Sequence, residues 1–261
     1  MTLVYNDLSV AYGDQYVLKD VHLTADPGET TVIVGISGSG KSTLLRSTLQ
    51  LLPPAAKIVK GTITYKGKVL NELKQQDLQG IRGSKIGMMF QQPGLYFSPV
   101  LRLDHQIKET LKANDYPEMD RHQEILLQSF ERIGLEHGER ILSSYPFELS
   151  GGMIQMMSLM LVSMLAPDFI LADEPTSALD VIHQKYVLDE LLRLQERQGV
   201  GILLVTHNLR IARDYGDKIA IMDEGRIVES GPAEQIMSSP QHPTTQALIR
   251  SLEQLEEGRS L

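Results

Sequence analysis

The sequence predicts an α/β fold built around a largely parallel sheet. Runs rich in β-branched residues alternate with helical patterns along most of the chain. Between residues 101 and 166 only helical patterns occur, which predicts a helical subdomain inserted into the α/β core. At 261 residues, 42% of them apolar, the chain can bury a sizeable core. We therefore expect one domain with subdomains.

The expected elements follow one another in a simple order. Residues 3–10 and 17–24 read as an antiparallel pair, and residues 61–65 are a candidate third strand. The parallel strands are assigned to four apolar segments, namely 30–35, 84–90, 169–173 and 201–206. Helices are expected at 41–52, 103–113, 119–133, 154–165, 232–237 and 244–255. This order predicts a catalytic core over residues 1–93 and 167–231, a helical subdomain over 94–166 and a C-terminal extension over 232–261.

Composition and charge exclude several classes of function. The chain has 25 Lys and Arg against 33 Asp and Glu, a net charge of −8, which argues against a nucleic-acid partner. It contains no Cys, so disulfides and thiolate metal sites are excluded. The N-terminus has no signal-peptide pattern, and the most apolar stretch, 156–166, is far shorter than the roughly 20 residues that span a bilayer. We expect a cytosolic chain whose membrane role, if any, runs through another chain.

A phosphate-binding loop is the strongest local motif. The segment GISGSGKST follows a predicted strand and opens a predicted helix, the context that a P-loop requires. Its glycines allow consecutive N–H groups to point inward at a helix N-terminus, where they bind phosphate. Lys41 is expected to pair with the β- and γ-phosphates of ATP, and the Ser42 hydroxyl to ligate Mg²⁺. The nucleotide-binding residues predicted here are Gly35, Ser37, Gly38, Ser39, Gly40, Lys41, Ser42 and Thr43.

An acidic pair follows a later strand. In FILADEP, Asp173 ends an apolar run and Glu174 comes next. A carboxylate at this position can hold Mg²⁺ beside the P-loop, and its neighbour can activate the attacking water. Acidic residues also occur at the start of ordinary turns, so the pair alone does not predict catalysis. Together with the P-loop it does.

A third motif makes the resemblance specific. LSGGM, at residues 149–153, resembles the signature motif of the ABC ATPase family, and it precedes FILADEPTSALD by the family's usual distance. With Tyr12, Gln91, Asp180 and His207 at matching positions, the resemblance covers essentially the whole chain. It implies a P-loop NTPase (RecA-like) core with an antiparallel β subdomain and an inserted α-helical subdomain, and an ATP hydrolase that uses ATP and Mg²⁺.

The resemblance also implies roles for single residues. Tyr12 resembles the aromatic residue that stacks on adenine, and Gln91 resembles the glutamine that reaches Mg²⁺ and the attacking water, with neighbouring Gln92 as the rival assignment. His207 resembles the switch histidine that contacts the γ-phosphate. The segment SALD, residues 177–180, resembles a loop that crosses a dimer interface, which places Asp180 there.

The same resemblance implies that one chain makes only half of each site. Ser150, Gly151 and Gly152 resemble residues that touch ATP bound to a second subunit, so dimerisation is expected to be part of the chemistry. Ile154 and Met156 stand where the family commonly has arginines, and this departure leaves open which polar network joins the helix to the core. Five methionines between residues 153 and 164 fit a thick apolar helix better than a soft binding surface.

Further segments resemble the branch of the family that serves peptide, opine and nickel importers. They are LADEPTSALD, SYPFELSGGM and the tail segment QHPTT. This implies two permease subunits, a solute-binding protein, a place at the cytoplasmic face of the membrane, and import of nickel, metal chelates or small peptides. Tyr96, Phe97 and Ser98 depart from the branch in the loop expected to receive the permease. A non-transport ATPase, such as an accessory subunit of a phosphonate-degrading complex, is the alternative, and a phosphate-transferring kinase is more distant.

Overall fold

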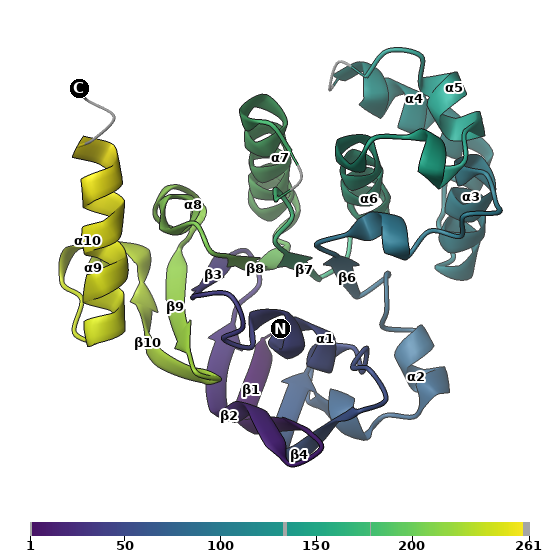
Figure 1. The fold of residues 1–261 in the computed structure, drawn as a ribbon. Coiled ribbons are helices and arrows are strands. Elements are labelled where there is room, and N and C mark those ends of the chain that lie inside the picture. The colour runs from purple at the N-terminus through teal and green to yellow at the C-terminus, as the bar shows by residue number, and fades with distance from the viewer. Residues whose placement is uncertain (1, 133–134, 178, 258–261) are drawn as a thin grey trace.

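A six-stranded sheet forms the centre of the molecule (Figure 1). The structure is a computed structural model that describes residues 2–132, 135–177 and 179–257. In the order β10-β9-β3-β8-β7-β6, neighbours pair in parallel, except that β10 runs antiparallel to β9. The strands are β3 (Thr30–Val34), β6 (Ile86–Met89), β7 (Phe169–Asp173), β8 (Gly201–Thr206), β9 (Lys218–Asp223) and β10 (Arg226–Pro232). The α/β class predicted from the sequence is confirmed.

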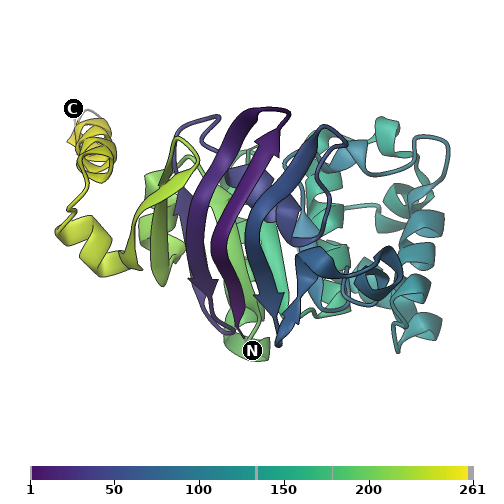
Figure 2. The same ribbon diagram turned by 90° about the horizontal axis from the view of Figure 1, so that it is seen from below.

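A second, antiparallel sheet crosses one side of the molecule (Figure 2). Its order is β2-β1-β4-β5, with β1 (Leu3–Tyr12), β2 (Gln15–Ala25), β4 (Ala56–Tyr65) and β5 (Lys68–Val69). The candidate third strand, expected at 61–65, is thus present but begins five residues earlier. The pairing of β1 with β4 shifts register between Asn6 and Ser9. Facing this shift, Gly61 has a φ of +85°.

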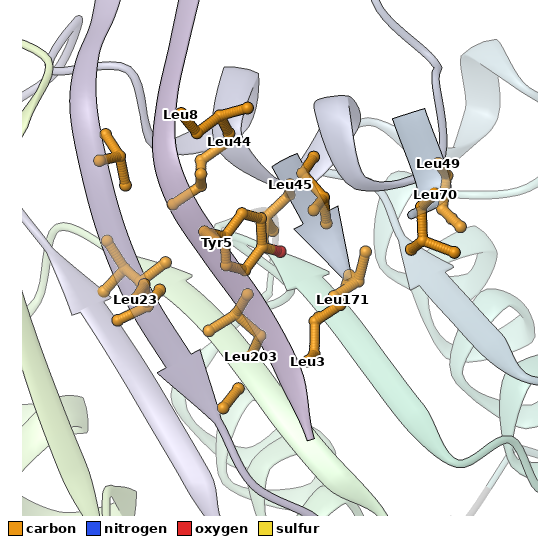
Figure 3. Close-up of a cluster of buried hydrophobic side chains, with 14 of the residues drawn as sticks. Leu3, Tyr5, Leu8, Leu23, Leu44, Leu45, Leu49, Leu70, Leu171 and Leu203 are labelled. Carbon is orange, nitrogen blue, oxygen red and sulfur yellow. The ribbon is translucent and has the colours of Figure 1, made fainter. Parts of the chain in front are cut away.

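Helix α1 (Lys41–Thr48) lies between the two sheets. Leu44 and Leu45 are fully buried against apolar side chains of both sheets (Figure 3). Those neighbours include Leu3 and Tyr5 of β1, Leu171 of β7 and Leu203 of β8. The Tyr5 hydroxyl also hydrogen-bonds to Thr48 Oγ1 at 2.6 Å. Because packing on both sides holds α1, the loop that precedes it is anchored to the core.

Helix α1 is shorter than the sequence predicts. It ends at Thr48 instead of residue 52, because Gln50 adopts a φ of +51° and its side-chain amide donates to the carbonyls of Leu70 and Leu73. Along the chain, two short helices lie between β5 and β6, namely η1 (Leu70–Glu72) and α2 (Gln75–Gln79).

The inserted segment is helical, as expected, and has its own apolar cluster. It contains η2 (Pro93–Leu95), α3 (Leu103–Ala113), η3 (Met119–Arg121), α4 (His122–Arg132), α5 (Gly138–Ser143), η4 (Pro146–Glu148) and α6 (Gly151–Leu165). The helix expected at 119–133 is therefore a 3-10 turn followed by α4, and its predicted last residue, Ile133, lies outside the described residues. Helix α6 begins three residues before the predicted 154.

The opposite face of the core sheet carries the remaining helices. They are α7 (Val181–Gln198), α8 (Leu209–Tyr215), α9 (Ala233–Ser238) and α10 (Pro243–Glu257). The expected tail helices at 232–237 and 244–255 correspond to α9 and α10. The elements that were not predicted from the sequence include α7, α8, β9 and β10 and the short elements β5, α2 and α5. In the described part of the chain, no helix is both long and apolar enough to cross a membrane.

Candidate functional site

The P-loop connects β3 to α1 at the carboxyl edge of the parallel sheet. Gly40, the residue before the helix, has a φ of +104°, a conformation that side-chain-bearing residues rarely adopt. A Cβ at Gly35 would lie 2.1 Å from the carbonyl oxygen of Met222. Both positions therefore require glycine, Gly40 for its conformation and Gly35 for its contact with β9. Met222 could not be assigned from the motif, because the contact depends on the pairing of β3 with β9.

The Lys41 ammonium lies inside this loop. It donates to the carbonyls of Gly35 and Ile36, both at 2.8 Å, and lies 3.4 Å from Ser39 Oγ. Burial lowers the pKa of Lys41, and the nearby carboxylates of Glu174 and Asp173 partly oppose this effect. The ammonium is thus held inside the loop by carbonyl acceptors, and phosphate oxygens could replace these acceptors.

Ser42 and Asp173 meet across the sheet edge. Ser42 Oγ donates to Asp173 Oδ1 at 2.7 Å. Asp173 is fully buried, and its Oδ2 has no hydrogen-bond partner among the described residues. Burial is the main reason that the pKa of Asp173 is raised, and the bond from Ser42 opposes it. A buried carboxylate oxygen without a partner is costly, and a cation would compensate it.

This arrangement fits Mg²⁺. A hydroxyl and a carboxylate are the oxygen ligands that Mg²⁺ takes from proteins, with phosphates and water completing its shell. Among the described residues, no three His, Asp or Glu side chains cluster so as to hold a metal by themselves. Ser42 and Asp173 would hold such a cation together with oxygen ligands from the phosphates and water.

Glu174 is held between two other predicted catalytic residues. Gln91 Nε2 donates to its Oε2 at 3.2 Å, and His207 Nδ1 lies 3.2 Å from its Oε1. Gln91 follows β6, Glu174 follows β7, and His207 follows β8, three adjacent strands of the sheet. Because parallel strands end at the same edge, the loop residues that follow them converge there. The structure thus brings all three together.

A cleft joins these groups to the end of the antiparallel sheet. Its volume is about 460 Å³, and it is lined by Tyr12, Gln15, Val17, Ser37, Gly38, Gly40, Lys41, Ser42, Thr43, Gln91 and Glu174. Tyr12, at the end of β1, shares this cleft with Lys41. The motif reading did not assign Gln15 and Val17, since neither belongs to a recognisable pattern.

The remaining predicted residues lie at the starts of two helices. The Ser150 side chain caps α6 by accepting from the Met153 N–H at 3.2 Å, and Gly151 and Gly152 form its first turn. Asp180 caps α7 and pairs with His183 Nδ1 at 2.6 Å. None of these four lines the cleft described above. Of the expected SALD loop, residue 178 lies outside the described residues.

Comparisons with known proteins show which family the chain belongs to. The family description "ABC transporter" matches residues 18–177. The oligopeptide transport ATP-binding protein OppD of Lactococcus lactis subsp. cremoris (strain SK11) is 37% identical over 238 residues, covering 91% of this chain and 70% of that protein. OppD of Bacillus subtilis (strain 168) is 33% identical over 259 residues, 97% of this chain and 72% of that protein.

Solved structures give the same result. An ATP-binding subunit of an ABC transporter superposes with a TM-score of 0.78 and 27% identity over 100% of both chains. A dimeric ATP-binding cassette in a post-hydrolysis state, bound to ADP and Pi, gives a TM-score of 0.76 and 29% identity over 88% of this chain and 98% of that one. The chain therefore belongs to the ABC transporter family, in the branch that the sequence resembles, and it is an ATP-binding subunit that hydrolyses ATP.

Proposed function

We propose that the chain is the motor subunit of an importer of small peptides. It would act with a second ATPase subunit and two permease subunits at the cytoplasmic face of the membrane, and receive cargo delivered by a solute-binding protein. The names of the relatives, oligopeptide transport and peptide import ATP-binding proteins, support peptides over nickel or metal chelates. No observation favours the non-transport alternative.

The observation that carries the proposed chemistry is the position of Glu174 between Gln91 and His207, beside the P-loop. In this mechanism Lys41 and the P-loop N–H groups bind the phosphates of ATP. Glu174 takes a proton from water as the water oxygen bonds to the γ-phosphorus and the bond to ADP breaks. His207 and Gln91 hold the carboxylate and the water in line. Ser42, Asp173 and Gln91 would hold Mg²⁺, which neutralises phosphate charge.

Tyr12 would stack on the adenine, and Ser37, Ser39 and Thr43 would complete the phosphate cradle. Ser150, Gly151, Gly152 and Asp180 lie outside the cleft, so we assign them to the nucleotide of the second subunit. This assignment explains why two exposed helix starts carry residues that the cleft of their own chain does not use.

The test is reconstitution with any permeases that are encoded beside this chain. In proteoliposomes that also receive the neighbouring solute-binding protein, we expect ATP-dependent uptake of labelled peptides of two to six residues. Uptake of nickel or a nickel chelate in place of peptides would contradict the peptide assignment. Two results together would contradict the importer assignment. They are the absence of permease genes beside this chain, and ATPase activity of the chain in a complex that contains no membrane subunit.

A further inference from the structure

A second cleft lies on the far side of the chain from the P-loop, between the helical segment and α7. Its volume is about 580 Å³. Helix α4 and the loop after α3 form one wall, the C-terminal half of α6 forms the floor, and α7 forms the other wall. In Figure 1, α6 and α7 stand next to each other on the same side of the core sheet. The cleft therefore joins two parts of the chain.

The cleft is cationic in a protein of net charge −8. Three arginines line it, Arg132 from α4 with Arg193 and Arg197 from α7, against one carboxylate, Glu190. Glu190 already pairs with Arg193 at 2.9 Å. Within the described residues, Arg197 forms no hydrogen bond or ion pair, and Arg132 donates only to Ser129 Oγ at 2.9 Å. Two guanidinium groups from different elements thus remain available to an anion.

The rest of the lining is amphipathic. The apolar part comes from Leu159, Met160, Met164 and Leu194. Tyr116 and Tyr186 add hydroxyls that have no hydrogen-bond partner in the described part of the chain. Burial raises the pKa of Tyr186, with smaller influences from Glu190, Arg132 and Arg193. Arginines from both walls therefore act on one half-buried hydroxyl.

Helix-end electrostatics account for only part of this pattern. Arg197 lies in the last turn of α7, where the helix dipole favours a cation. Arg132 lies in the last turn of α4, where the dipole of that helix also favours a cation, but neither dipole requires the two side chains to line the same cleft. Guanidinium groups bind carboxylate and phosphate through paired N–H donors, while methionine side chains adapt to apolar groups of varied shape.

We propose that this cleft binds a small molecule that carries an anionic headgroup, a carboxylate or a phosphate, on a short apolar body. Arg132 and Arg197 hold the headgroup, and Met160 and Met164 contact the apolar part. Helix α6 begins at the signature motif and α7 begins just after Asp180. An occupant at the other ends of these two helices, about 20 Å away along α6, fixes their relative orientation. The site is independent of the importer assignment.

The experiment measures binding directly, without ATP. The protein is labelled at its methionine methyl groups and titrated with octanoate and with octyl phosphate, each below its micelle concentration, and with octanol and acetate as controls. We expect saturable shifts of the Met160 and Met164 signals and no shift of Met237, which lies on α9. The tighter of the two anions identifies the headgroup.

Charge variants complete the test. Arg197→Gln and Arg132→Gln should each weaken binding about tenfold, the scale of one charge-assisted hydrogen bond. Arg250→Gln, at an exposed position on α10, is the matched control and should change nothing. Arg132 and Arg197 are both exposed, so the two variants should fold. Binding of octanol as tight as that of the anions, equal binding by the wall variants, or no saturable binding of either anion would each overturn the proposal.

Discussion

Glu174 adopts a left-handed backbone conformation, with a φ of +44°, directly after the last residue of β7. A residue with a Cβ pays about 1–2 kcal/mol for this region. A hydrogen bond from its N–H to the carbonyl of Val205, at 3.0 Å, helps to hold the conformation. The turn points the carboxylate at Gln91 and His207. Backbone strain at this residue thus accompanies the placement of the proposed base.

Replacing Glu174 with Gln tests its role. The amide keeps the shape and can still accept from Gln91, but it cannot take a proton, so we expect ATP affinity to be retained and turnover to fall by at least about 100-fold. Nucleotide affinity by calorimetry and phosphate release by the dimer are the measurements. Glu253→Gln, at an exposed position on α10, is the control. Turnover within a few-fold of the parent would remove Glu174 from the mechanism.

Asp173 lends itself to a test of pH dependence. Burial raises its pKa in the folded chain, so the ionised carboxylate opposes folding at pH values above the folded pKa. This penalty shrinks as pH falls through the folded pKa and is absent below the unfolded value of about 3.9. Without nucleotide, Asp173→Asn should therefore raise the unfolding temperature at pH 7 by at least about 2 °C, a shift resolvable at this size.

The gain should disappear near pH 4, and the variant should lose the stabilisation that Mg-ATP gives the parent. Differential scanning calorimetry at several pH values measures both effects. An apo variant less stable than the parent at pH 7 would mean that the carboxylate is compensated by groups other than a bound cation.

At the scale of the element, the pairing of β1 with β4 depends on Gly61. A Cβ there would lie 2.4 Å from the carbonyl oxygens of Asn6 and Asp7, both backbone atoms. The strand must bend at this point, because the register shifts between Asn6 and Ser9. Since β1 also covers α1, the bend affects how the P-loop helix is held.

Gly61→Ala should destabilise the chain by several kcal/mol, since the clash adds to the left-handed strain of about 1–2 kcal/mol. Gly67→Ala is a matched control, because Gly67 also has a positive φ, +75°, but no atom lies within 4 Å of its Cβ position. Gly67→Ala should therefore lose only the stability that the left-handed conformation costs a residue with a Cβ. Urea unfolding of both variants measures the difference, and equal losses would show that the bulge relaxes freely.

At the scale of the whole molecule, the proposed nucleotide contacts are divided between two places. The cleft beside Lys41 holds one set, while Ser150, Gly151, Gly152 and Asp180 lie at other helix starts. The similar dimeric cassette bound to ADP and Pi shows that such chains can associate. The division makes dimerisation a requirement for turnover in our proposal.

Gly151→Asp tests the contacts to the second subunit separately from the contacts inside the cleft. A carboxylate at the start of α6 would repel the γ-phosphate held by the second subunit, while Lys41, Ser42 and Asp173 stay unchanged. We expect normal ATP affinity for the isolated variant, and loss of ATP-driven dimerisation and of hydrolysis, measured together with the natural partner subunit. Weak ATP binding by the monomer, or dimerisation with full turnover, would contradict a role across the interface.

The chemistry could be predicted from the sequence because it depends on short contiguous motifs. Lys41 and Ser42 are set by one loop, Asp173 and Glu174 by one strand end, and the P-loop N–H groups by local glycines. The class of fold followed from hydrophobic runs of the right length. Local patterns suffice where a function depends on neighbours in the chain.

Other features were decided only by the tertiary structure. The need for glycine at position 35 comes from Met222, 187 residues later, and the end of α1 comes from bonds between Gln50 and the carbonyls of Leu70 and Leu73. The left-handed turn at Glu174 and the cleft between α4, α6 and α7 also have no local pattern. These features come from contacts between segments distant in sequence, and such contacts exist only once the sheets and helices have packed together.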